Sequence, residues 1–209
     1  MALSMMTVNH VCNALSEPWQ LIGYITGRPC LAVFAIVLTS RLGTDPARAL
    51  RAILRLLVWG VVAQPGYTLL SSAFGLQLDV LFTLAIGAAA IWLFQTGRHL
   101  ALAVLMVVVI AGRHYLDGGA EIPLAMFSAS ILMPKHPMLA VWTIALVSMA
   151  GNYLDTPDFW PAALAVLLAV PILRLSRLLD TIVPRLPRLF FYTYYTLHLW
   201  LIFLAVGPY

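Results

Sequence analysis

Charged residues are scarce in this chain. Only 10% of its 209 residues are Asp, Glu, Lys or Arg, whereas 62% are hydrophobic and the mean hydropathy is +0.94. Soluble globular domains carry about 25% charged residues, so an ordinary water-exposed surface is excluded. The composition predicts an all-α integral membrane protein, a polytopic transmembrane helical bundle, and we expect residues 1–209 to form one membrane domain.

Cysteine and metal-ligand clusters are also rare. Cys12 and Cys30 both stand in apolar sequence, which indicates small buried hydrophobes rather than a structural disulfide. Neither Cys nor acidic residues accompany the histidines at metal-ligand spacing, so we expect no metal site. The chain has no glycine-rich phosphate loop and no nucleophile elbow. Its first residues lack the basic region of a signal peptide, so we expect no cleavage there.

Apolar segments make up most of the chain. We identify nine of them, and a helix needs about 20 apolar residues to cross a bilayer comfortably. Several are shorter, the first above all, and the fifth and sixth could instead form one interrupted pair. The sequence therefore predicts about nine helices, at roughly 1–15, 20–40, 50–70, 77–96, 99–112, 121–134, 137–151, 159–174 and 189–206.

Basic residues are unevenly distributed between the loops. With the N-terminus inside, Arg113 is the only basic residue in the outer loops, and Arg28 lies within an apolar segment. By the positive-inside rule this asymmetry predicts an N-in, C-out topology. The same rule accounts for the net charge of +4, so we expect contacts with membrane lipids and none with nucleic acid. The basic residues of the inner loops are Arg41, Arg48, Arg51, Arg55, Arg98, Lys135, Arg174, Arg177, Arg185 and Arg188.

Arg28 stands inside the segment 20–40, directly before Pro29. An arginine in a spanning helix costs a few kcal/mol or more, so such residues usually face a partner or a wet cavity. Asp79, at the start of the fourth segment, is the expected charge partner of Arg28. Gln64 is uncharged and could donate or accept a hydrogen bond beside them.

Two histidines are candidates for proton transfer, because imidazole can take up and return a proton near neutral pH. His10 lies in the first segment, and its residue type alone favours a packing role between helices. His198 lies in the last segment, with Tyr194 and Tyr195 four and three residues before it on one helix surface. It is too deep in the segment for an aromatic belt at the interface, so we favour a functional role for His198.

Three arginines repeat at helical spacing. Arg48, Arg51 and Arg55 follow an i, i+3, i+7 pattern, with Arg41 just upstream. Anchoring to lipid headgroups is the commoner role of such a face. Guanidinium forks also match phosphate oxygens, so this face is a candidate site for the phosphates of a cytoplasmic donor such as coenzyme A.

Several blocks of the sequence resemble the TraX family of F-type conjugative plasmids, which is similar, more distantly, to the transmembrane acyltransferases. The resemblance covers residues 5–95 and 188–205. It implies an inner-membrane acetyltransferase that modifies the N-terminal amine of the conjugative pilin with acetyl-CoA as donor. The blocks that carry it are MMTVNH, GRPCLAVFAIVLTSRL, RLLVWGVVAQPGYTLL, LDVLFTLAIG and FFYTYYTLHLWLI.

The resemblance also implies roles for individual residues. The family's Asp-His pair falls on Asn9 and His10, so an asparagine replaces the usual aspartate, whereas Asp79 stands where an asparagine is common. The implied catalytic residues are His10 or His198 as base, with Arg28 or a tyrosine such as Tyr195 stabilising the oxyanion. The implied substrate-binding and cofactor-binding residues are Arg41, Arg48, Arg51, Arg55, Gln64 and Asp79. The remaining family positions fall on Gly27, Leu56, Ala63 and Leu199.

Other functions stay open at this point. The chain could be an acyltransferase with another acceptor, such as a glycan hydroxyl, a lipid hydroxyl or a pilin in a different maturation step. It could also be a membrane chaperone or adaptor that holds pilin without any chemistry. A small-solute transporter is disfavoured, because the two halves of the chain show no matching pair of broken helices.

Overall fold

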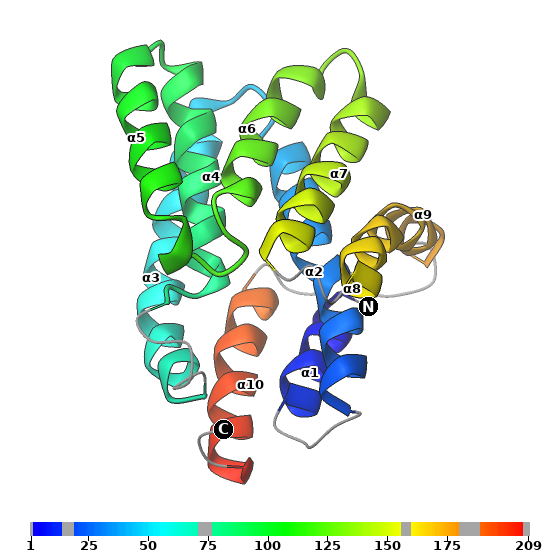
Figure 1. Ribbon diagram of the computed structural model, residues 1–209. Helices are drawn as coiled ribbons and strands as arrows, with labels where there is room; N and C mark the ends of the chain where they lie inside the picture. The colour runs from blue at the N-terminus through cyan, green and yellow to red at the C-terminus, as the bar shows by residue number, and fades with distance from the viewer. Residues whose placement is uncertain (1, 14–18, 71–76, 156–159, 180–188, 207–209) are drawn as a thin grey trace.

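Figure 1 shows the computed structural model, which describes residues 2–13, 19–70, 77–155, 160–179 and 189–206. These ranges contain α-helices, two short 3-10 helices and no strand, so the all-α prediction is confirmed for the described part of the chain. The elements are α1 (Ala2–Asn13), α2 (Trp19–Leu42), α3 (Pro46–Leu70), α4 (Val80–Gln95), α5 (His99–Ala111), η2 (Arg113–Tyr115), α6 (Glu121–Leu132), α7 (Pro137–Asp155), α8 (Trp160–Ala165), η4 (Val166–Leu168), α9 (Ala169–Leu179) and α10 (Phe190–Val206).

Each of the nine predicted segments contains helix. The fifth and sixth are separate helices, α5 and α6, joined by η2 and a turn. The eighth differs from the prediction, because α8 gives way to η4 and then to α9 within it. A 3-10 stretch between two helical pieces changes the direction of the side chains from one turn to the next.

Helix α2 lies at the centre of the bundle and contacts α1, α3, α4, α6, α7, α8 and α9. Its sequence allows this close approach, because Ala32 and Ala35 are completely buried and present almost no side chain to their neighbours. Small residues bring helix axes together where lipid provides no hydrophobic driving force.

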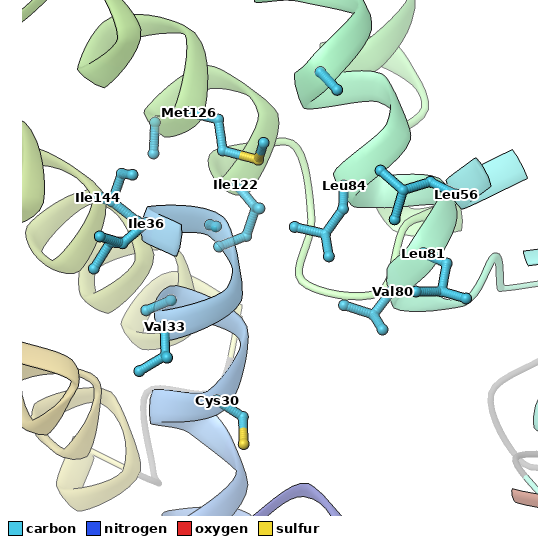
Figure 2. Close-up of a cluster of buried hydrophobic side chains, with 14 of the residues drawn as sticks. Cys30, Val33, Ile36, Leu56, Val80, Leu81, Leu84, Ile122, Met126 and Ile144 are labelled. Atoms are coloured by element: carbon cyan, nitrogen blue, oxygen red, sulfur yellow. The ribbon is translucent and has the colours of Figure 1, made fainter. Parts of the chain in front are cut away.

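The apolar core lies between α2, α4, α6 and α7. Figure 2 shows Ile36 and Val33 of α2 beside Ile122 and Met126 of α6, with Ile144 of α7 next to them. A second group of core side chains in the same view lines the α3–α4 contact, namely Leu56, Leu81 and Leu84. These side chains hold α4 and α6 at fixed positions, and the start of each helix borders the polar residues described below.

Large apolar side chains are also exposed on the outside of the bundle. Leu100 and Val107 on α5 and Leu204 on α10 are 81%, 67% and 75% exposed. Apolar faces of this extent mark contact with a partner or a membrane. Among the described helices, α2 alone is long and apolar enough to count as a candidate span, over Ile25–Leu42, and five others have apolar stretches of 10–17 residues.

Three interhelical turns meet at one end of the bundle. The α2–α3, α4–α5 and α6–α7 turns all lie at the top of Figure 1, and the Gln95 side-chain amide donates to the Gly43 carbonyl at 2.6 Å across the first two. This end contains Arg41, Arg48, Arg98 and Lys135, all exposed. It is the end that the positive-inside rule assigns to the cytoplasm.

Non-helical backbone enters the bundle near the start of α4. Leu78 pairs with Leu116 in an isolated parallel bridge, where Leu78 N–H donates to Tyr115 at 2.7 Å and Asp117 N–H donates to Leu78 at 3.0 Å. Gly118 turns the chain directly afterwards with φ +83°, a conformation that favours glycine. The bridge therefore sets Asp79 and Asp117 beside each other, each one residue beyond a paired leucine.

Candidate functional site

The first and last helices bring the two candidate histidines together. Helix α10 contacts α1, and the ring centroids of His10 and His198 are 5.3 Å apart at an interplanar angle of 50°. His198 is 5% exposed, and His10 is half-buried. Two imidazoles distant in sequence therefore form one pair inside the protein.

Hydrogen bonds and ring contacts fix the orientation of His198. Its Nδ1 lies 3.1 Å from the Tyr194 carbonyl oxygen, and its Nε2 is buried without a hydrogen-bond partner among the described residues. Tyr194 stacks on the imidazole at 5.6 Å, and the Tyr194 hydroxyl shares a 2.7 Å hydrogen bond with Thr7 of α1. If Nδ1 carries the proton donated to the carbonyl, Nε2 is left as a free acceptor, the form required of a general base.

Tyr195 links the histidine pair to a second polar group. Its ring contacts His198 edge to face at 5.5 Å, as the helical spacing predicted, and it is 1% exposed. Its phenol lies within electrostatic range of Asp79, Asp117 and Tyr67, and it interacts with the backbone N–H of Val80. Tyr195 therefore stands between the imidazoles on one side and the start of α4 on the other.

Asp79 caps α4 from a completely buried position. Its Oδ1 accepts from the backbone N–H groups of Leu81 and Phe82 at 2.8 and 3.3 Å, and its own N–H donates to the Gln64 side chain at 2.9 Å. The Gln64 amide nitrogen in turn donates to the Gln77 carbonyl at 2.8 Å. Gln64 and Asp79 thus lie together, as expected, and both support the start of α4.

The prediction that Asp79 is the charge partner of Arg28 is wrong. Within the described ranges, Asp79 Oδ2 accepts no hydrogen bond, and the carboxylate on which the Arg28 charge acts is Asp117. Burial raises the pKa of Asp117, and the nearby Arg28 guanidinium opposes that rise. The backbone bridge is the physical reason, because it brings the loop carboxylate of Asp117 inward beside Asp79.

The arginine face of α3 lies away from the histidines. Arg48 and Arg51 approach the Asp45 carboxylate at 3.7 and 4.0 Å, and the Arg48 guanidinium donates to the Arg41 carbonyl at 3.1 Å. Exposed ion pairs of this kind contribute about 0–1 kcal/mol, so these guanidinium groups stay available to a phosphate. Arg55 is one turn further along the helix, within electrostatic range of Tyr192 on α10.

The structure also places the other residues singled out in the sequence. Cys12 and Cys30 are buried and do not form a disulfide, as predicted. Asn9 packs against Gly27, where a side chain on the glycine would overlap the Asn9 carboxamide. The described residues contain no group of three side chains that could hold a metal ion.

Sequence reasoning missed the inner position of Asp117 and the contact between Thr7 and Tyr194. Asp117 lies in the loop between η2 and α6, and the Gly118–Gly119 pair after it was the available signal of a sharp return. Thr7 lies one helical turn before His10 and therefore shares its side of α1.

The arrangement brings together groups that can accept a proton and donate a hydrogen bond. It contains a buried imidazole with a free acceptor nitrogen, a neighbouring tyrosine hydroxyl and a carboxylate with an unused oxygen. Such groups can remove a proton from an attacking atom and donate to a developing oxyanion.

Comparison with known proteins gives one match. A family model described as TraX protein matches residues 1–206. No curated protein and no solved structure matches the chain.

Proposed function

The chain belongs to the TraX family, whose role lies in conjugation and F-pilin maturation, and on that premise we propose that it is a multi-pass inner-membrane acetyltransferase. It transfers the acetyl group of acetyl-CoA to the N-terminal amine of a conjugative pilin subunit. The observation that carries this proposal is the contact between His10 and the buried His198, whose Nε2 has no partner among the described residues.

The acceptor amine begins as an ammonium group, so its nitrogen loses two protons while a C–N bond replaces the C–S bond. His198 takes the first proton, and the neutral amine then attacks the thioester carbonyl. The Tyr195 hydroxyl or the Arg28 guanidinium stabilises the oxyanion, and the thiolate of coenzyme A takes the second proton as it leaves. His10 holds the His198 ring and the developing charge in place.

The donor enters from the end that carries the α2–α3 turn. At about 1.5 Å per residue, Arg51 and Gln64 are about 20 Å apart along α3. A donor held by its phosphates at the arginines must therefore reach the histidines by a long arm, which the pantetheine chain of coenzyme A provides.

Exchanging Arg48 and Arg51 together for glutamine should raise the KM for acetyl-CoA about tenfold or more and leave kcat nearly unchanged. Each substitution removes a charged donor to phosphate, an interaction made equally in the ground and transition states. Steady-state kinetics in nanodiscs would measure this, with Arg98→Gln as control. Arg98 is exposed at the same end but stacks over the Trp92 ring at 4.9 Å. An unchanged KM would remove the arginines from the donor site.

A C-terminal alkaline phosphatase fusion should be active, because the proposed topology puts the C-terminus in the periplasm. The physical reason is the gathering of Arg41, Arg48, Arg98 and Lys135 at the opposite end of the bundle. A fusion to a reporter that works only in the cytoplasm serves as the counterpart. Activity of that reporter alone would mean that the number of spans differs by one.

Mass spectrometry of the cognate pilin tests the function as a whole. Pilin from cells with the protein should carry one acetyl group at its N-terminus, and pilin from cells lacking it should carry none. Pilin of unchanged mass but reduced amount would support the chaperone alternative. An acetyl group found elsewhere would identify another acceptor.

A further inference from the structure

We propose that Asp79 is the binding site for the acceptor's ammonium group, and that this carboxylate selects a primary amine over a hydroxyl. The inference rests on the proposed acyl transfer and names the chemical class of its acceptor. It assigns Asp79 a binding role in addition to its capping of α4.

Only one of the two carboxylate oxygens of Asp79 accepts hydrogen bonds from the described residues. The side chain is 0% exposed, and Oδ1 accepts both capping hydrogen bonds, whereas Oδ2 accepts none from the described residues. Leaving a buried charged acceptor unsatisfied is unfavourable, and such atoms are rare in folded proteins. A ligand with N–H donors would satisfy Oδ2.

The surroundings of Asp79 favour a cation. Asp117 lies within electrostatic range of it as a like charge, and the Arg28 charge acts on Asp117. The bridge between Leu78 and Leu116 holds the two carboxylates in place, and the Thr83 hydroxyl donates to the Asp117 carbonyl at 2.8 Å. A neutral hydroxyl would relieve none of this repulsion, but an ammonium group would.

A second unpartnered atom lies on the other side of Tyr195. His198 Nε2 is buried and has no hydrogen bond within the described residues, and Tyr195 contacts the His198 ring while standing within range of Asp79. An ammonium held at Asp79 must lose one proton before it can attack, and His198 Nε2 is the acceptor that the described residues leave open. The neutral amine keeps two N–H groups, and one of them can still donate to Asp79 Oδ2.

An apolar groove lies on the outside of the bundle, beside two residues that hydrogen-bond to Asp79. It has a volume of about 560 Å³ and lies between α3 and α4, and two residues of its wall hydrogen-bond to Asp79: Gln64 through its side chain and Phe82 through its backbone N–H. An apolar chain in the bilayer that carries a free amine at its end fits this combination. The wall residues are Val61, Gln64, Pro65, Thr68, Leu69 and Phe82.

The test measures binding without any acetyl donor. The full chain in nanodiscs is titrated with an apolar helical peptide whose N-terminus is a free amine, an acetyl group or a hydroxyacetyl group. We expect the free amine to bind the unmodified protein about ten- to a hundredfold more tightly than either blocked peptide, as one charged hydrogen bond would give. In Asp79→Asn the ratio of the affinity for the free amine to that for the blocked peptides should fall to nearly one. The affinity for the acetylated peptide should be unchanged.

The variant and its control are matched in structure. The asparagine oxygen can still accept from Leu81 and Phe82, so the cap of α4 is kept. Asp45→Asn changes the same residue type in the same position at the start of α3, where Asp45 accepts from Ala47 and Arg48, and it should keep the full preference.

The inference is overturned if the unmodified protein binds all three peptides equally, or if Asp79→Asn retains the preference. The first comparison needs no variant and stays decisive even if Asp79→Asn fails to fold. An intact amine preference together with unacetylated pilin would support the ammonium site and reject the acetyl transfer.

Discussion

Replacing His198 by alanine should lower the rate of acetyl transfer by about 10²- to 10⁴-fold, the usual cost of losing a general base. The substitution removes Nε2, the buried ring nitrogen left without a partner in the described structure. The protein should still fold and insert, and its affinity for acetyl-CoA should be unchanged, because the arginine face lies at the other end of α3. Turnover and donor binding by the purified protein in nanodiscs would measure both quantities.

Other histidines provide the controls for this prediction. His99→Ala and His136→Ala alter exposed side chains near helix ends and should change turnover little. His10→Ala should also lose activity, since its ring lies 5.3 Å from that of His198. Full transfer activity in His198→Ala would end the assignment of the base, and loss of acetyl-CoA binding would make His198 a donor-binding residue.

Replacing Gly27 by alanine should destabilise the protein by about 1–3 kcal/mol, the range for overpacking a filled interface. A Cβ at this position would overlap the Asn9 side chain and push α1 away from α2. Because His10 follows Asn9, the same movement should separate the two histidines and lower turnover at least tenfold. Thermal unfolding in detergent and the acetyl-transfer rate would be measured on the same preparation.

Gly66→Ala is the matched control for Gly27→Ala. It also places a methyl group on a helical glycine at a helix contact, but its Cβ would lie 3.5 Å from Leu199 and Trp200, an ordinary van der Waals distance. Stability should therefore stay the same or rise slightly, since alanine favours the helix over glycine. Equal unfolding temperatures for both variants would contradict the prediction, because they would show that α1 and α2 can move apart without loss of stability.

The helices were predictable from the sequence because apolar length determines them, and the family could be identified from ordered blocks of polar and apolar residues. The break within the eighth segment was not predictable, since a local 3-10 stretch of apolar residues leaves no change in hydropathy. Membrane spanning remains an expectation, and α2 is the one described helix that is both long enough and apolar enough to meet it.

The candidate site was predictable where spacing along one helix decides the contact. Tyr194 and Tyr195 contact His198 because residues three and four apart share a helix surface. The partner of Arg28 was wrong because a loop residue, Asp117, enters the interior through the Leu78–Leu116 bridge. A pairing between backbone segments 38 residues apart follows from tertiary structure, and no local sequence pattern predicts it.

The pairing of α1 with α10 has a consequence for biosynthesis. His10 is synthesised well before His198, so the imidazole pair cannot assemble until α10 has been made. A nascent chain interrupted anywhere before α10 carries one half of the pair and none of the Tyr195 contacts. If the chain acts as proposed, such a truncated product transfers no acetyl group.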